Sequence, residues 1–242
     1  EGSPVQRQQL FGYTLEELRI LVAPMVRDAK EAIGSMGTDT PVAALSNRPR
    51  QLFDYFQQLF AQVTNPPLDA IREELITAVC ISIGAEENLL KPGPLACRRI
   101  NIPHPVITES QLAAIVGIES PEGPKGFRSK VLDGRYVVAD GTVGLTEALE
   151  RLRSDASAAI ADGANILIIS DRGLRADLAP IPSLLSTGAI HHHLIREKTR
   201  TKVGLIVESG DAREVHHIAL LLGYGAAAVC PYVALEAVDH LV

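Results

Sequence analysis

The chain of 242 residues carries 23 Lys and Arg against 29 Asp and Glu, a net charge of −6, and 46% of it is hydrophobic. This length can form one large domain or two small ones with a proper core. The acidic balance, without any basic run, argues against binding to nucleic acid or to an anionic membrane. No apolar run approaches the roughly 20 residues of a membrane-spanning helix.

The three cysteines, Cys80, Cys97 and Cys230, are far apart in the sequence. An odd number at this spacing argues against a disulfide framework, and no C-x-x-C pair predicts a zinc or iron–sulfur site. The polar first residues predict no signal peptide. The chain starts at Glu1 rather than at a methionine, which suggests processing or, as we favour, an excised segment of a longer chain. We expect a cytoplasmic protein, and an organelle stroma would also fit.

Residues from about 10 to 90 are predicted to be helical. Residues 14–17, TLEE, form a capping-box pattern that opens a first helix. A second helix is expected between Pro49 and Asn65, because apolar side chains recur at 3.6-residue spacing. These apolar residues are Leu52, Phe53, Phe56, Leu59 and Phe60. A third helix is expected to begin near Leu68.

Residues from about 90 to 140 are rich in proline and glycine and are predicted to be irregular, with a short strand at 136–139. A long irregular segment is unusual inside a compact domain. We therefore expect this segment to wrap over a larger assembly or to serve as a linking surface.

Residues from about 141 to 242 alternate between strand and helix patterns. Thr146 is expected to cap a helix that ends at Asp162 and Gly163. The strands expected after it are 166–169, 203–207 and 226–229, and the helices between them are 181–198 and 211–222. Such alternation with short connections predicts right-handed βαβ units and a parallel sheet. The fold class is therefore α/β, either barrel-like or doubly wound in this half, with a helical N-terminal part.

Polar residues follow the predicted strands. Asp171, Arg172 and Glu208 stand at the carboxyl ends, where parallel sheets bind ligands. They could form an active site or an ion-pair network that orders the loops, and we favour the network. Neither a G-x-G-x-x-G run nor a P-loop predicts a phosphate site.

Histidines and cysteines offer little further chemistry. Residues 191–193 and 216–217 are consecutive histidines, and neighbours on a helix point about 100° apart, so one metal ion cannot collect them. Cys97 precedes two arginines that would favour its thiolate, but no base is identifiable beside it. We therefore expect no catalytic, cofactor-binding or metal-binding residue in this chain.

Two segments resemble a known family. Residues 31–41, EAIGSMGTDTP, and residues 59–67, LFAQVTNPP, are similar to runs of glutamate synthases. Later segments agree as well, namely 170–173, 181–185, 188–196 and 212–217. The departures are small: Leu68 and Ala70 replace the usual Ile and Pro, and Thr38 stands where Asn or Asp is common. The chain from about residue 10 onward thus resembles the central domain of a glutamate synthase large subunit.

The resemblance implies a place between two active sites. Glutamate synthases hydrolyse glutamine at an N-terminal cysteine and pass ammonia through a tunnel to a flavin domain. There 2-oxoglutarate is aminated and reduced by FMN, which an iron–sulfur cluster supplies with electrons. The partners implied for residues 1–242 are the amidotransferase and FMN-binding domains of the same chain, and ammonia is the channelled intermediate. FMN and the cluster would be bound outside this segment.

The resemblance also implicates tunnel residues. The family's corresponding loops face the tunnel constriction, which points to Met36 and Thr64, with Ser35, Asp39 and Asn65 in support. A flexible methionine can gate an apolar constriction, and a threonine hydroxyl can both donate and accept a hydrogen bond. Alternatively, Met36 only packs and Thr64 caps the turn into Asn65.

The function expected from the sequence is that of a scaffold and ammonia-channelling domain, inactive when isolated. Two alternatives remain. A self-standing α/β barrel enzyme would bind flavin or phosphate through Asp171, Arg172 and Glu208. A protein–protein interaction module would present an exposed apolar patch unrelated to Met36 and Thr64.

Overall fold

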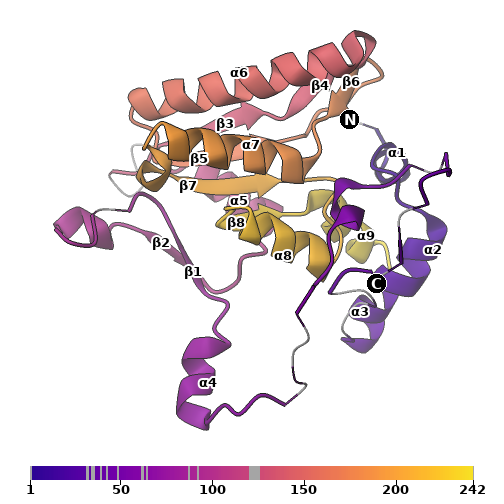
Figure 1. The fold of residues 1–242 in the computed structure, drawn as a ribbon, viewed down its shortest axis with the longest axis horizontal. Coiled ribbons are helices and arrows are strands. Elements are labelled where there is room, and N and C mark those ends of the chain that lie inside the picture. The colour runs from indigo at the N-terminus through magenta and orange to yellow at the C-terminus, as the bar shows by residue number, and fades with distance from the viewer. Residues whose placement is uncertain are drawn as a thin grey trace.

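A parallel sheet organises the C-terminal half of the molecule. The computed structural model describes residues 2–30, 33, 36–38, 40–41, 43–47, 49–60, 63, 65–86, 88–91, 93–119 and 126–241. The strands are β3 (Ser129–Asp133), β5 (Ile166–Ser170), β7 (Gly204–Glu208) and β8 (Ala228–Cys230). They lie in the order β3-β5-β7-β8 and all run in the same direction (Figure 1). The α/β prediction is therefore confirmed.

Three helices connect these strands and cover one face of the sheet. They are α6 (Gly141–Ala161), α7 (Ser183–Arg196) and α8 (Val215–Gly223). Their apolar stripes share one core with alternate strand residues such as Leu167 and Leu205. Because each right-handed crossover advances in the same direction, all three helices lie on the same side. The described parallel strands lie side by side in the same order as in the sequence, without a reversal. This arrangement is that of a segment of a parallel barrel wall.

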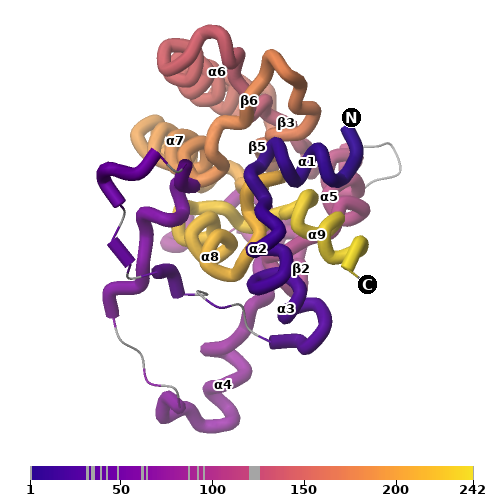
Figure 2. The backbone as a smooth tube through the Cα atoms, turned by 90° about the vertical axis from the view of Figure 1, so that its right-hand side faces the viewer, coloured from indigo at the N-terminus to yellow at the C-terminus, as the bar shows by residue number. Residues whose placement is uncertain are grey.

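The other face of the sheet is covered by segments from elsewhere in the chain. They are α5 (Glu109–Val116), α9 (Tyr232–Asp239) and the antiparallel pair β1 (Ile81–Ile83) and β2 (Ile100–Ile102), and α1 (Pro4–Leu10) packs against α9. Figure 2 shows α1, α5 and α9 on the side of the sheet opposite α7 and α8. Ile166, Ile168 and Ile206 point into this second core. Strand β5 is buried on both faces, as its unbroken apolar run predicts.

The N-terminal helices follow their capping signals. Thr14 accepts a hydrogen bond at Oγ1 from the Glu17 amide over 3.2 Å, and the Glu17 carboxylate accepts one from the Thr14 amide over 2.8 Å. This capping box opens α2 (Leu15–Glu17), which continues through a π-helical turn, Leu18–Val22, into α3 (Ala23–Asp28).

The second predicted helix is wrong. Among residues 49–60, which the structure describes, the only helical element is a 3₁₀ turn, Leu52–Tyr55, and Phe56 already has extended backbone angles. Tertiary contacts explain the difference: the Phe53 ring stacks on His217 at 4.2 Å, and the Phe56 ring meets Tyr224 edge-on at 5.8 Å. Each aromatic side chain is thus held individually rather than on one helical stripe.

The third predicted helix forms and begins at Ala70, two residues after the predicted start near Leu68. It is α4 (Ala70–Ile76), and Asp69 caps it by accepting hydrogen bonds from the amides of Ile71 and Arg72. None of its residues is buried. In both views α4 projects away from the sheet (Figures 1 and 2).

The irregular segment predicted for 90–140 is only partly irregular. It contains β2, α5, β3 and β4 (Arg135–Val137), the last of which pairs antiparallel with β6 (Leu178–Pro180). The sequence pattern does not predict β3, because this strand lies at the end of the sheet and is not continuously apolar. It carries Lys130 and Asp133, and its Val131 is 43% exposed. The middle of the chain thus supplies an outer strand of the main sheet.

Helix boundaries in the C-terminal half also differ from the prediction. Helix α6 begins at Gly141, so Thr146 lies inside it and donates a hydrogen bond to the Thr142 carbonyl instead of capping the helix. Helix α8 begins at Val215, because Ser209 and Asp211 form hydrogen-bonded turns at the end of β7. No helix in the described ranges is long and apolar enough to cross a membrane.

Candidate functional site

The carboxyl ends of the parallel strands carry a network of paired side chains. Ser170 donates a hydrogen bond from Oγ to Glu208 Oε2 over 2.5 Å. The Arg172 guanidinium pairs with Glu208 and, over 2.7 Å, with Glu109 of α5. The same guanidinium lies 4.1 Å from the centroid of the Tyr232 ring. Arg172 and Glu208, named from the sequence, therefore form an ion pair at this edge.

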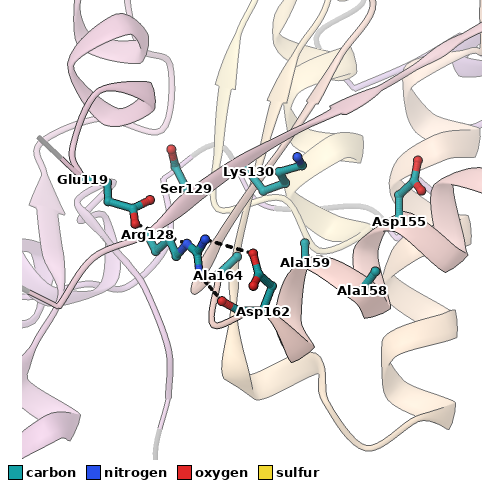
Figure 3. Close-up of a pocket in the computed structure, with 9 residues that line it drawn as sticks. All are labelled: Glu119, Arg128, Ser129, Lys130, Asp155, Ala158, Ala159, Asp162 and Ala164. Carbon is teal, nitrogen blue, oxygen red and sulfur yellow. Dashed lines mark hydrogen bonds and ion pairs between the residues drawn. The ribbon is translucent and has the colours of Figure 1, made fainter.

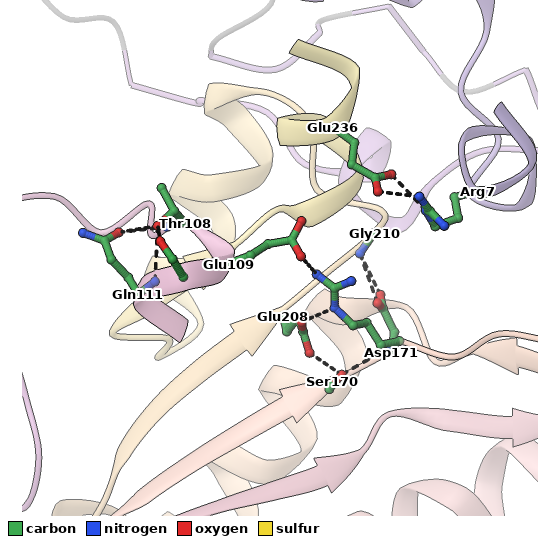
Figure 4. Close-up of polar contacts among 11 residues, drawn as sticks. Arg7, Thr108, Glu109, Gln111, Ser170, Asp171, Glu208, Gly210 and Glu236 are labelled. Atoms are coloured by element: carbon green, nitrogen blue, oxygen red, sulfur yellow. Dashed lines mark hydrogen bonds and ion pairs between the residues drawn. The ribbon is translucent and has the colours of Figure 1, made fainter. Parts of the chain in front are cut away.

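Asp171 points the other way, into the protein. Its side chain is buried and accepts hydrogen bonds from the Gly210 amide at 2.9 and 3.2 Å (Figure 4). Burial, with the nearby Asp211 carboxylate as a further cause, raises the pKa of Asp171 well above its usual value, although the Gly210 amide opposes the change. Asp171 is thus a buried structural carboxyl that joins the loops after β5 and β7.

Asp211 fastens the same edge to helix α7. Its carboxylate accepts hydrogen bonds from the Ser183 hydroxyl over 2.5 Å and from the Ser183 amide over 3.1 Å. Ser183 is the first residue of α7, and Pro182 before it provides no side-chain cap. Asp211 therefore satisfies a free amide and places a negative charge at the positive end of the helix.

Little room remains at this end of the sheet. A cavity of about 20 Å³ lies beside Arg172 and Tyr232, bounded on its other side by Phe11. This is space for about one water molecule, whereas ligand pockets usually enclose about 300–1,000 Å³. In the described structure these side chains bind one another and leave no space for a flavin among them.

The remaining titratable groups are dispersed. Five histidines have hydrogen-bonding partners, and each uses a different one: Arg200 for His191, Ser157 for His193, the Phe56 carbonyl for His216, Glu214 for His217 and the Glu236 carbonyl for His240. No cluster of His, Cys, Asp and Glu within the described ranges could hold a metal ion. Cys230 is buried, and burial raises the pKa of its thiol to about 12, so it is a poor nucleophile.

Of the candidate tunnel residues, the structure describes Met36 and Asn65. Ser35, Asp39 and Thr64 are outside the described residues. Met36 is 54% exposed, and its carbonyl accepts a hydrogen bond from the Gln58 amide over 3.0 Å. Asn65 is also exposed.

A cavity of about 450 Å³ adjoins the segment that carries Met36. Its lining residues are Leu21, Ile33, Gly37, Thr38, Phe53, Asp54, Phe56, Glu214 and His216. Glu214 contributes a buried carboxylate oxygen, Oε2, that has no hydrogen-bond partner among the described residues. The cavity is lined by apolar side chains together with the polar ones of Thr38, Asp54, Glu214 and His216. Sequence reasoning missed it, and the only signal was the histidine pair at 216–217.

A second cavity, of about 530 Å³, opens at the other end of the sheet (Figure 3). There Arg128, just before β3, pairs with Asp162 at 2.9 Å and with Glu119 at 3.3 Å. These three side chains are between 42% and 75% exposed, which is typical of surface ion pairs. The cavity lies at the amino ends of the strands, whereas parallel sheets bind ligands at the carboxyl ends.

The comparisons with known proteins agree with one another. The sequence profile described as glutamate synthase central domain matches residues 6–242. The chain is 44% identical over 234 residues to a glutamate synthase [NADH] of Schizosaccharomyces pombe, covering 96% of this chain and 11% of that protein. It is 46% identical over 228 residues to the glutamate synthase [NADPH] large chain of Bacillus subtilis, covering 94% and 14%.

A cyanobacterial relative extends this range. The chain is 43% identical over 238 residues to ferredoxin-dependent glutamate synthase 2 of Synechocystis, covering 97% of this chain and 15% of that protein. The chain thus spans only a small part of the length of these relatives. Their names differ in the electron donor, while the similarity extends over nearly all of the present sequence. The chain belongs to the glutamate synthase central domain family.

Proposed function

We propose that this chain is the scaffold and ammonia-channelling domain of a glutamate synthase. It would link the hydrolysis of glutamine to the reductive amination of 2-oxoglutarate, which gives L-glutamate. Its family and its relatives, all glutamate synthases of which it spans 10–15%, support this function. The reactions themselves would take place in other parts of the enzyme.

The closed carboxyl edge of the sheet is the observation that carries this proposal. At this edge, where a parallel sheet would bind a ligand, Arg172, Glu208 and Glu109 pair with one another and Asp171 is buried. This arrangement speaks against the alternative of a self-standing flavin- or phosphate-binding barrel. FMN and the iron–sulfur cluster would be held by other domains of the same enzyme.

The partners that we propose are the amidotransferase and FMN-binding domains of the same chain. The support is the exposed apolar surface of the N-terminal half, where Leu59, Ile71, Leu75 and Leu89 are each more than 80% exposed. A seven-residue helix such as α4 is not stable in water on its own. Large exposed apolar surfaces generally mark contacts with other proteins or domains. A separate protein could use the same surface, as expected of an interaction module.

The path of ammonia is proposed to pass Met36 and Thr64, with Ser35, Asp39 and Asn65 bracing the same loops. Ammonia must be kept from bulk water, where it would be protonated and lost. Met36 supports this role because it is half exposed on a segment tied to the core, beside a cavity lined by both apolar and polar side chains. A flexible methionine can open and close such a path without a large backbone change.

The cell compartment is proposed to be the cytoplasm or, in a plant or alga, an organelle stroma. Two plant relatives are named as chloroplastic ferredoxin-dependent enzymes. The NADH, NADPH and ferredoxin named for the relatives would be used outside this segment.

A paired assay tests the scaffold role. The purified chain is incubated with FMN and separately with glutamine, and flavin absorbance and released ammonia are measured. We expect neither stoichiometric flavin binding nor glutamine hydrolysis. Either activity would show that this segment contains a site of its own.

Substitution of Thr64 tests the channel. In the full-length enzyme, Thr64→Val removes the hydroxyl but keeps the shape of the side chain. We expect glutamine hydrolysis and flavin reduction to continue, with more glutamine hydrolysed than 2-oxoglutarate consumed. Strict one-to-one coupling in the variant would contradict a role of Thr64 in the channel.

A further inference from the structure

The segment that carries Met36 is held by a second extended segment. Gly37 forms an antiparallel bridge with Gln57, and the Gln58 amide donates to the Met36 carbonyl over 3.0 Å. These are the contacts that place the backbone of Met36 within the described structure. The position of Met36 therefore depends on what fixes residues 56–58.

Helix α8 fixes residues 56–58 through His216. The His216 ring is 9% exposed, and its Nε2 lies 3.0 Å from the Phe56 carbonyl oxygen. Because a carbonyl oxygen can only accept, Nε2 carries the proton and donates this hydrogen bond. One side chain of α8 thus binds the backbone next to the residues that pair with Met36 and Gly37.

Gly37 lies close to both the Phe56 carbonyl and the His216 ring. Its φ angle is +84°, and a Cβ there would lie 2.8 Å from the Phe56 carbonyl oxygen and 3.0 Å from His216 Cε1. No side chain fits between these groups. Gly37, the Phe56 carbonyl and the His216 ring therefore form a three-way contact without spare room.

The same segment is also anchored at its start. Gln51 donates a hydrogen bond from Nε2 to the Asp211 carbonyl over 3.3 Å, and the Phe53 ring stacks on His217 at 4.2 Å. The extended segment is thereby attached to the carboxyl edge of the sheet and to α8. Of these anchors, His216 acts closest to Met36.

We propose that His216 is a positioning residue of the ammonia channel, holding the Met36 segment in place through the Phe56 carbonyl. This inference rests on the proposed function, because it requires Met36 to line the path of ammonia. His216 itself need not touch ammonia. Loss of its hydrogen bond would let residues 56–58 move and displace the backbone of Met36.

The test compares two substitutions of His216 in the full-length enzyme. His216→Leu removes the donor, whereas His216→Gln supplies an amide N–H that can donate to the same carbonyl. We expect His216→Leu to hydrolyse more glutamine than the 2-oxoglutarate it consumes, with an unchanged glutaminase rate. His216→Gln should restore one-to-one coupling. His193→Leu is the matched control, because His193 also makes one side-chain hydrogen bond, in its case to Ser157 of α6.

Hydrogen exchange of the Gln58 amide measures the position directly. In His216→Leu this amide should exchange roughly two- to tenfold faster, as expected for the loss of one hydrogen bond. In His216→Gln and His193→Leu it should exchange as in the unmodified enzyme. Unchanged exchange in His216→Leu would overturn the positioning role whatever the coupling.

Two further variants separate this inference from the proposed function. If Met36→Ala or Thr64→Val uncouples the reactions while His216→Leu stays coupled, the channel stands and the role of His216 is wrong. If Met36→Ala, Thr64→Val and His216→Leu all stay coupled, the channel is in the wrong place and the inference falls with it.

Discussion

The C-terminal sheet and the segment from residue 59 to residue 90 differ in how their apolar side chains are used. In the sheet, Ile166 and Leu205 are fully buried between two layers. In the other segment Leu75 is 82% exposed and Leu89 is 93% exposed. Both regions are apolar in sequence, but in the described part of the second segment only β1, through Ile83, is buried against the sheet, and the other apolar side chains named here have no cover. The stability of the isolated chain should therefore come from the sheet and its helices, whereas the exposed segment should depend on neighbouring domains.

The largest effect is expected in the core of the sheet layer. Leu152 of α6 is fully buried. Leu152→Ala should lower the free energy of unfolding by about 2–5 kcal/mol, because it removes buried apolar atoms and leaves a cavity. Urea unfolding of the isolated chain measures the change. A loss below about 1 kcal/mol would show that this layer does not dominate stability.

A smaller loss in the free energy of unfolding is expected from a substitution at the carboxyl edge of the sheet. Arg172→Met keeps an apolar stem against Tyr232 but leaves Glu208, whose side chain is only 11% exposed, without its cation. We expect a loss of about 1–3 kcal/mol. Arg175→Met is the matched control, since Arg175 and Asp177 are both more than 60% exposed and should contribute less than about 1 kcal/mol. Equal losses in urea unfolding would mean that Glu208 is as well solvated as Asp177.

Asp171, at the same edge, should make the free energy of unfolding depend on pH. Because the pKa of Asp171 is raised in the folded state, the folded protein keeps a proton that the unfolded protein loses. The free energy of unfolding therefore falls as the pH rises above the unfolded pKa of about 3.9, with a slope of at most about 1.4 kcal/mol per pH unit. Asp171→Asn removes this contribution. Its unfolding midpoint, measured from pH 4 upward, should decline less than that of the unmodified chain, and an identical decline would contradict the assignment.

The sequence predicts the centre of this sheet better than its edge. Strand β5 is recognisable because every position from Ile166 to Ile169 is apolar and lies between two layers. Strand β3 is not, because Lys130 and Asp133 interrupt its apolar pattern at the outer position of the sheet. The false helix after Pro49 shows the converse, since Phe53 and Phe56 follow helical spacing but bind separate partners on and near α8.

The contacts of the candidate site are also only partly predictable from the sequence. The pairing of Arg172 with Glu208 follows from the positions of both residues at adjacent strand ends. The contact with Glu109 does not, because it depends on how α5 packs across the sheet. The contact between His216 and the Phe56 carbonyl joins residues 160 positions apart, and periodicity has no bearing on such a contact. The role proposed for Met36 rests on family resemblance, and its neighbours are identifiable only from the structure.

The smallest effect is expected for a substitution on α4. This substitution tests directly whether neighbouring domains cover the exposed segment. Leu75→Ala should change the free energy of unfolding of the isolated chain by no more than about 0.5 kcal/mol, because Leu75 is 82% exposed there. If neighbouring domains cover α4, the same substitution in the full-length enzyme should create a cavity at a buried contact and lower its thermal midpoint. Differential scanning calorimetry of both proteins compares the two cases. Equal, negligible changes would mean that α4 remains exposed in the enzyme, and its apolar face would then be free to bind a separate partner.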